Sequence, residues 1–313
     1  MIERKRELIP SPGDLSAPLV NIMSAAKPRF REIQESDIEA IADLLTRGFV
    51  HRSRDYWMQG LLRQGTRSLP VDAPRFGYMI ENDGKPVGCL LLIYSTKTIG
   101  GEAGICCNVS SWYVDPEFRN YAALLASMTQ KRKDVTYFNV TPAVPTWPIL
   151  EAQGFQAYCR GLYFSLPVLS RQGRGMRVEA VVPDTASMSG LPDDELAMLK
   201  RHAGYGCLSL VCRTAQEAVP FIFFPLRKRR GVIPLPALQL GFSREISDFV
   251  RCAGAIGRYL LWRGQPIIIL DANGPVEGLV GVYNEARGRK YFRGPLRPRL
   301  GDLADTELAI FGM

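Results

Sequence analysis

The stretch from Tyr113 to Leu125 most constrains how this chain can fold, because it has the pattern of a strand that turns directly into a helix. The side chains of Trp112 to Val114 favour a β-strand, and Asp115-Pro116 ends it. Good helix formers follow from Ala122 to Met128. A helix that begins in this way presents free backbone N–H groups and the positive end of its dipole beside the strand's end. Such an end can bind an anionic group.

The sequence on both sides of this stretch alternates between strand and helix patterns. Period-two and continuous apolar runs predict strands, and apolar residues at helical spacing predict helices. The turn Asn82 to Lys85 separates two strands as a hairpin. We expect strands at 29–33, 77–81, 87–94, 105–114 and 135–140, helices at 38–45, 54–64, 122–132 and 146–153, and one or two closing strands within 156–166.

A similar order of elements recurs after the stretch Pro167 to Gly175, whose Pro, Arg and Gly residues indicate a linker. A helix from Arg244 to Arg263 carries apolar residues along one side and stands between two apolar strands. The expected strands are 208–212, 219–224, 235–240 and 266–271. We therefore predict an α/β protein with mixed sheets (α+β), in which a flexible arm (1–28) precedes a first domain (29–166), a linker (167–175) and a second domain (176–313).

The composition is that of a globular protein, with 46% hydrophobic and 22% charged residues in 313. No apolar run approaches the roughly 18 residues that a membrane span needs, and the start of the chain lacks the apolar core of a secretion signal. Seven cysteines without a CxxC pair indicate reduced, buried thiols. We expect a cytoplasmic protein without membrane insertion. With two histidines, nothing supports a metal site, and the net charge of +8 favours anionic partners.

The residues VDPEFR at 114–119 resemble motif A of the GNAT acyltransferases, whose usual form is V-x-P-x-x-R/Q-G-x-G-x-G/A. The three glycine positions of that motif fall on Asn120, Ala122 and Leu124. The resemblance implies two tandem GNAT-like acyl-CoA N-acyltransferase domains, of which the second is diverged. It also implies acetyl-CoA or another acyl-CoA as co-substrate. Its expected contacts are Trp112, Tyr113, Val114, Arg119, Asn120, Tyr121, Ala122, Ala123 and Leu124.

The proton-transfer positions of the GNAT family are less well filled. Where many members carry a carboxylate on the motif A strand, this chain has Asn108, Ser110 and Ser111. Where many members carry the tyrosine that acts as the general acid, this chain has Leu150. Hydroxyl groups relay protons but are poor bases alone. The catalytic candidates are therefore Ser110, Ser111 and Tyr121, while Glu102, Tyr137 and Tyr158 are better explained by a turn and by packing.

Three functions fit these patterns. The first is acyl-CoA-dependent N-acyl transfer to an amine of a small molecule or peptide. The second is Fem-type transfer from an aminoacyl-tRNA, in which the basic stretches Leu226 to Arg230 and Arg287 to Arg299 bind phosphates while Tyr291 and Phe292 stack on a base. The third is a non-catalytic protein that binds a ligand or partner. Each of the three functions is compatible with a homodimer.

The last twelve residues are first acidic and then apolar. We expect a final strand that carries Leu308, Ile310 and Phe311 into the core of the second domain. The carboxylates of Asp302, Asp305 and Glu307 are expected to form structural ion pairs. Alternatively, they line a cleft between the domains and bind a cationic acceptor.

Overall fold

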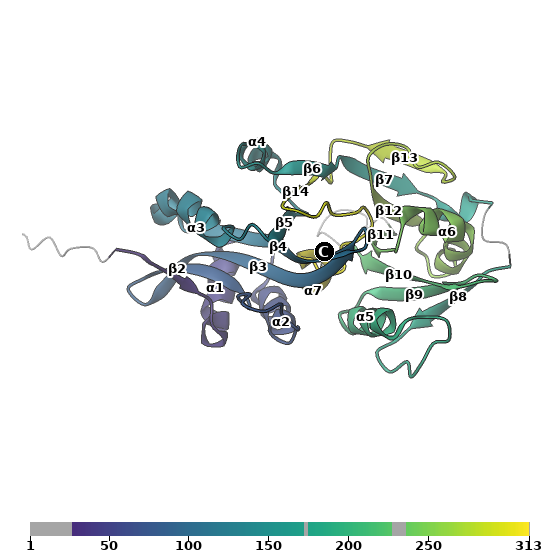
Figure 1. Cartoon of the computed structure of the whole chain (residues 1–313), viewed down its shortest axis with the longest axis horizontal. Coiled ribbons are helices and arrows are strands. Elements are labelled where there is room, and N and C mark those ends of the chain that lie inside the picture. The colour runs from purple at the N-terminus through teal and green to yellow at the C-terminus, as the bar shows by residue number, and fades with distance from the viewer. Residues whose placement is uncertain (1–26, 172–174, 227–235, 313) are drawn as a thin grey trace, which may run out of the picture.

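The chain forms two seven-stranded mixed sheets that lie side by side (Figure 1) in a computed structural model that describes residues 27–171, 175–226 and 236–312. Sheet A contains, in spatial order, β1 (Arg29–Glu32), β2 (Gly77–Asn82), β3 (Lys85–Ile99), β4 (Glu102–Val114), β5 (Val135–Asn139), β14 (Lys290–Arg293) and β6 (Gln156–Cys159). Sheet B contains β8 (Arg177–Val181), β9 (Leu208–Arg213), β10 (Ala218–Pro225), β11 (Ala237–Phe242), β12 (Ile267–Ala272), β7 (Gly161–Ser165) and β13 (Gly281–Asn284).

The helices follow the same division into two halves. They are α1 (Ile38–Gly48), α2 (Arg54–Gly65), α3 (Ala122–Thr129), α4 (Trp147–Ala152), α5 (Asp193–Gly204), α6 (Ile246–Leu261) and α7 (Glu307–Ile310), with short 3-10 turns at Glu35–Asp37, Pro116–Tyr121, Val144–Thr146 and Pro167–Leu169. The expected helices and strands of the first half are thus present with small shifts of their ends. The sequence analysis did not predict β8, α5, β13 and β14. The N-terminal arm lies almost wholly outside the described residues.

The two sheets repeat one topology. Strands β8 to β12 occupy the same places in sheet B that β1 to β5 occupy in sheet A. In each sheet one parallel pair, β4 with β5 or β11 with β12, is connected through a helix, α3 or α6. The fold is therefore a mixed α/β architecture of two halves with the same topology, as the sequence predicted.

Each half donates one strand to the other half's sheet. Strand β7 follows β6 in the chain but pairs with β12 and β13 of sheet B. Strand β14 follows β13 but lies between β5 and β6 of sheet A. The expectation that both closing strands of 156–166 belong to the first sheet is therefore wrong for β7. Local pattern cannot decide which sheet a short strand joins, because either sheet satisfies its backbone hydrogen bonds.

The faces of sheet A are set by the alternation of β3. Cys89, Leu91 and Ile93 pack on one face with α1 and α2, and Leu90 and Leu92 pack on the other face with α3 and α4. Figure 1 shows the same arrangement, with these helix pairs on opposite sides of the sheet. A further core contains residues of both sheets, among them Phe138 and Val211, so the two halves share buried contacts.

The C-terminal segment does not form the expected strand in the second core. It forms α7 near the centre of the molecule, and Ile310 and Phe311 enter the core of α1 and α2 in the first half. The Phe311 ring lies 5.7 Å from that of Trp57. A Cβ atom at Gly60 of α2 would overlap the Phe311 ring, so the glycine permits this close approach. Leu308 packs instead in the core shared by both halves.

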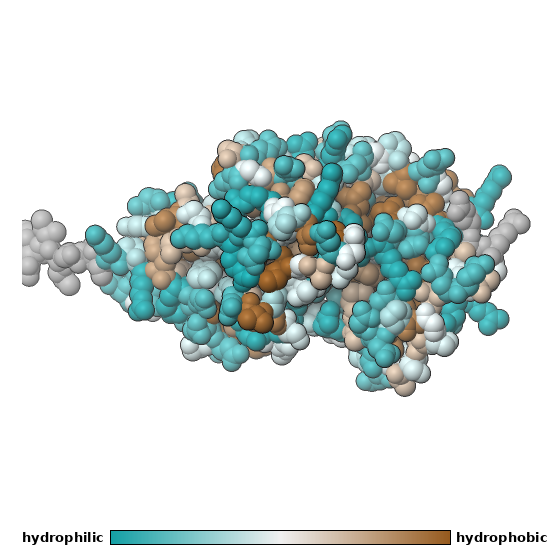
Figure 2. All heavy atoms as spheres, in the orientation of Figure 1, coloured by the Kyte–Doolittle hydropathy of each residue, from teal (hydrophilic) through white to brown (hydrophobic). Residues whose placement is uncertain are grey.

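Two further expectations concern cysteines and the surface. All seven cysteines are free, and six of them are buried, as the sequence predicted. Among the described residues, the helices include none with the length and hydropathy of a membrane span. Hydrophilic side chains cover most of the face shown in Figure 2, and apolar side chains gather around β7, β12 and α6.

Candidate functional site

The most distinctive feature of sheet A is the separation of β4 from β5. Their parallel ladder runs from Ile105–Val135 only to Asn108–Phe138, and β5 ends one residue later. Strand β4 continues to Val114 and stays paired with β3 over that length. The peptide groups of residues 109–114 that face β5 therefore have no place in its ladder. Unpaired strand edges of this kind can hydrogen-bond an extended ligand.

A β-bulge lies at the point where the two strands separate. Leu92 pairs with Val109 and Leu90 pairs with Trp112, so Ser110 and Ser111 both stand opposite Leu91. A bulge increases the local twist and can redirect a side chain. Ser110 is 8% exposed, and its hydroxyl lies 3.5 Å from that of Ser111. Polar side chains are thus held inside the sheet at its opening.

Glu307 of α7 reaches this opening from the far end of the sequence. Its backbone N–H donates to Oδ1 of Asn108 at 2.8 Å. The hydroxyl of Thr141, just after β5, donates to its Oε1. Its Oε2 is buried and has no hydrogen-bond partner within residues 27–171, 175–226 and 236–312. A carboxylate oxygen is therefore available for a proton at the end of the β4–β5 ladder.

The surroundings of Glu307 make its carboxylate more basic. Burial raises its pKa above the ordinary value, because the charged form loses solvation. The adjacent polar groups of Thr141, Ser110 and Asn108 act in the opposite direction but do not outweigh burial. A carboxylate with a raised pKa is suited to act as a general base near neutral pH.

Sequence reasoning missed this position of Glu307 at the opening of sheet A. It treated the glutamate with Asp302 and Asp305 as a structural ion pair or an acceptor contact. The structure pairs Asp302 with Lys97 at 2.7 Å and Asp305 with Arg67 at 2.6 Å, which confirms structural pairing for these two. Glu307 has no such cation within 4.0 Å among the described residues. Nothing in the sequence indicated the contact between Glu307 and Asn108, because the two residues are 199 positions apart.

The motif A residues lie at the far end of the same strand. Val114 is buried, Trp112 is partly exposed, and Arg119, Asn120 and Ala123 are exposed. A 3-10 turn from Pro116 to Tyr121 precedes α3, so the helix begins later than a direct strand-to-helix turn requires. Leu124 is 47% exposed and is not packed in the core. The expected contact of these residues with acyl-CoA stays a prediction.

Of the three catalytic candidates from the sequence, two lie at the opening between β4 and β5 and one does not. Ser110 lies beside Glu307, and Ser111 is its neighbour in the bulge. Tyr121 packs against Phe30 with ring centroids 6.2 Å apart. The remaining alternatives do not reach the opening as free groups: Tyr137, Leu150 and Tyr158 are buried in cores, and Glu102 is exposed at the start of β4.

The basic stretches proposed for tRNA binding are only partly described. Residues 227–230 lie outside the described residues. In the second stretch Tyr291 is fully buried and Phe292 is 9% exposed, because both belong to β14 inside sheet A. The expectation that these two rings stack on a base is therefore wrong. The aminoacyl-tRNA hypothesis itself stays a prediction.

Sheet B has a similar separation of strands, but the chain's own tail occupies it. The ladder of β11 and β12 ends at Gln239–Ile269, and Gly241 is the extra residue of a bulge. The N–H of Leu303 donates to the carbonyl of Gly241 at 2.8 Å, and the N–H of Ser243 donates to the carbonyl of Gly301 at 2.9 Å. The segment 301–303 thus occupies, beside β11 in sheet B, the backbone positions that correspond to the open ones beside β4 in sheet A.

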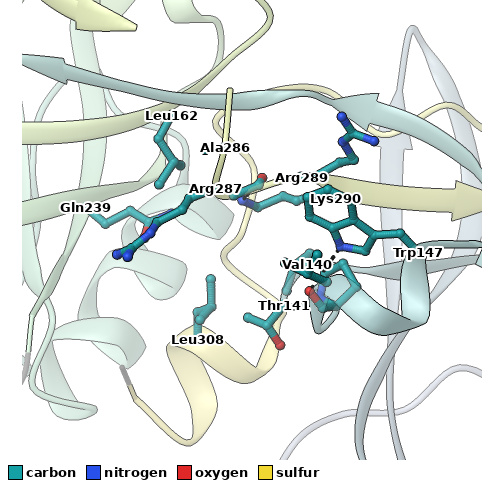
Figure 3. Close-up of a pocket in the computed structure, with 13 residues that line it drawn as sticks. Val140, Thr141, Trp147, Leu162, Gln239, Ala286, Arg287, Arg289, Lys290 and Leu308 are labelled. Atoms are coloured by element: carbon teal, nitrogen blue, oxygen red, sulfur yellow. Dashed lines mark hydrogen bonds between the residues drawn. The ribbon is translucent and has the colours of Figure 1, made fainter. Parts of the chain in front are cut away.

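A pocket of about 280 Å³ lies between the halves, close to Glu307. Val140 and Thr141 after β5, Leu308 of α7 and Trp147 of α4 form one side, and the loop before β14 forms another (Figure 3). Thr141 connects this pocket to Glu307 through its hydroxyl. Within the described part of the chain, no cluster of His, Cys, Asp and Glu could hold a metal ion.

The fold resembles that of several solved proteins, among them two acetyltransferases. A GCN5-related N-acetyltransferase from Anabaena variabilis ATCC 29413 superposes with a TM-score of 0.55 at 14% identity, over 85% of this chain and 72% of the other. A GCN5-related N-acetyltransferase from Kribbella flavida gives 0.52 at 14% identity, over 85% and 71%. Eis1 from Mycobacterium abscessus gives 0.50 at 12% identity, over 88% and 74%.

Comparisons of the sequence with known families and proteins do not identify this likeness. No protein-family model matches the chain, and no curated protein sequence matches it. The likeness therefore lies in the arrangement of strands and helices. The chain has the fold of the GCN5-related N-acetyltransferases, present as two GNAT-like halves.

Proposed function

We propose that the protein is an acyl-CoA-dependent N-acyltransferase whose reaction centre is the opening between β4 and β5. The observation that carries this proposal is the buried Oε2 of Glu307, an unpartnered carboxylate oxygen within the described chain at the end of the β4–β5 ladder. The fold supplies the strand opening, and the C-terminal segment supplies a base that β4 itself lacks. Acyl-CoA, as co-substrate, supplies an activated thioester carbonyl.

The residues divide the work between binding and proton transfer. Peptide groups of β4 beyond Asn108 can hydrogen-bond the extended arm of the co-substrate, while Arg119 and the amides after β4 are suited to its phosphates. Glu307 accepts the proton of the acceptor amine, and Thr141 and Asn108 hold it in place. The net charge of +8 attracts the polyanionic co-substrate over a longer range.

The structure also supports one co-substrate site in each chain. The opening of sheet B is occupied by the segment 301–303, which hydrogen-bonds to both sides of the bulge at Gly241. The same tail then continues to Glu307 of α7, which contacts Asn108 at the opening of sheet A. We therefore propose that the second half serves to position the tail rather than to bind a second acyl-CoA.

Titration calorimetry with acetyl-CoA and longer acyl-CoAs tests the proposal. We expect binding with one site per chain, and release of CoA when an amine acceptor is added. The absence of binding at high micromolar concentrations of every acyl-CoA tested would remove the proposal. In that case the protein would be a non-catalytic descendant of the fold.

A further inference from the structure

The pocket between the halves carries chemistry that the proposed reaction does not yet use. Its lining is mostly apolar, with Val140, Val144, Trp147, Leu162 and Leu308 among its walls. Three cationic residues, Arg287, Arg289 and Lys290, also line it. None of the residues that line it is acidic. This combination favours a small ligand that has an apolar body and a negative charge.

The three cations differ in how far they are already satisfied. Lys290 is 2% exposed and binds Asp271 of β12 at 2.8 Å. Arg289 lies over the ring of Trp147, 4.3 Å from its centroid. Arg287 is exposed and has no ion-pair or hydrogen-bond partner within the described chain. Arg289 also lacks an ion pair, and its Nε is buried without a hydrogen-bond partner among the described residues. Arg287 and Arg289 therefore both face the pocket without an anionic partner in the part of the chain that the structure describes, and Arg287 is the more exposed of the two.

Gln239 supplies a polar side chain to the wall of the pocket. It lies on β11 at the end of the ladder with β12, is only 5% exposed, and lines the pocket. Its side-chain amide has no hydrogen-bond partner among the described residues. In Figure 3 Gln239 and Arg287 lie toward one end of the pocket and Trp147 toward the other. The amide reaches the pocket, so its N–H groups can donate to a ligand there.

We infer that this pocket binds the acceptor, and that the acceptor is a neutral α-amino acid with an apolar side chain. This inference rests on the proposed N-acyl transfer. The carboxylate of the acceptor binds Arg287 and the amide of Gln239, and its side chain lies against the apolar walls. Its amine points toward Thr141, where Glu307 takes up the proton. The amine nitrogen attacks the thioester carbonyl, and the C–S bond breaks as the C–N bond forms. The proton that Glu307 took up passes to the departing thiolate, so CoA leaves as the thiol.

The size and charge of the pocket narrow the acceptor class. A volume of about 280 Å³ lies near the lower limit of about 300 Å³ for small-molecule sites, so it suits an amino acid better than a folded peptide. A polyamine or another purely cationic acceptor would meet the three cationic residues without any acidic residue in the lining. The carboxylate distinguishes an amino acid from such amines and defines the test.

The test compares acids with their amides as acceptors. With saturating acetyl-CoA, kcat/KM is measured for L-phenylalanine and L-leucine and for the C-terminal amides of both. We expect the wild-type protein to prefer the acids by at least about tenfold, the factor typical of one charged hydrogen bond. Arg287→Ala should reduce this ratio to near one. The control Arg297→Ala, an exposed arginine outside the pocket, should keep the ratio.

Several outcomes overturn the inference. Equal or better turnover of the amides by the wild-type protein contradicts it, as does an equal loss for acids and amides in Arg287→Ala. Failure to acetylate any of these acids, in a protein that binds acetyl-CoA, contradicts it as well. If the length of the acyl chain alone sets kcat/KM, the pocket holds that chain instead. Acetyl-CoA binding, measured separately, shows whether the proposed function itself fails.

Discussion

Replacing Glu307 by glutamine removes the proposed base with little change in shape. Glutamine keeps an oxygen that can accept the Thr141 hydroxyl, and its backbone N–H still donates to Asn108. General base catalysis contributes about 10² to 10⁴ in rate, which corresponds to ~2.7 to 5.5 kcal/mol of transition-state stabilisation. We expect kcat for acetyl transfer to fall within this range while the affinity for acetyl-CoA stays unchanged. Steady-state kinetics with thiol detection and calorimetry measure these two quantities.

The pH dependence separates catalysis from structure in the same variant. Burial raises the pKa of Glu307 in the folded protein, so the unfolded state releases this proton more readily. The stability linked to this group is full below the unfolded pKa of about 4.3 and decreases as pH rises through the folded pKa. Glu307→Gln should therefore be as stable as wild type, or more stable, at pH 7.5, and the difference should vanish near pH 4.

The catalytic rate should respond to pH in the opposite sense. The wild-type kcat/KM should rise with pH as Glu307 loses its proton, and this rise should be absent in Glu307→Gln. Glu277→Gln, an exposed position, is the matched control. A variant that retains both the wild-type rate and its pH profile would refute Glu307 as the base. A large loss of thermal stability at pH 7.5 would show that the residue acts structurally.

Three further predictions follow from neighbouring contacts. In Thr141→Val the hydroxyl that lowers the pKa of Glu307 is lost, so kcat/KM should fall more at pH 6 than at pH 8.5; equal loss at both would contradict the contact. In Lys290→Met the buried Asp271 loses its partner at 2.8 Å, so the free energy of unfolding measured in urea should fall by about 3 to 5 kcal/mol. The double variant with Asp271→Leu should recover most of this loss. A single variant as stable as wild type would contradict the pairing. Calorimetry should give one acetyl-CoA per chain, whereas two sites would show that the tail segment 301–303 leaves β11.

Much of the fold was predictable because its signals are local. The apolar run from Val87 to Tyr94, the turn at Asp83-Gly84 and the helix pattern of α6 each specify one element without reference to the rest of the chain. The missed helix α5 also had a local signal, since Asp193 to Glu195 place acidic residues in its first turn. The placement of β7 in sheet B and of β14 in sheet A had no local signal, because a strand of four or five residues carries no information about which sheet it joins.

The candidate site was only half predictable for the same reason. Ser110 stands on the motif A strand, and its place near the site follows from the order of elements. Glu307 lies in a short acidic tail whose neighbours Asp302 and Asp305 do form ordinary ion pairs. The packing of Phe311 against α2, in the core that α1 also lines, helps to hold Glu307 at Asn108. Long-range contacts of this kind depend on the assembled core rather than on local pattern.

The most direct test of the account is a crystal structure of the full chain with CoA. The account predicts a single CoA per chain, with its extended arm between β4 and β5 beyond Asn108 and Phe138 and its sulfur on the side where Glu307 lies. A CoA bound between β11 and β12, or at a site remote from Glu307, would contradict the account.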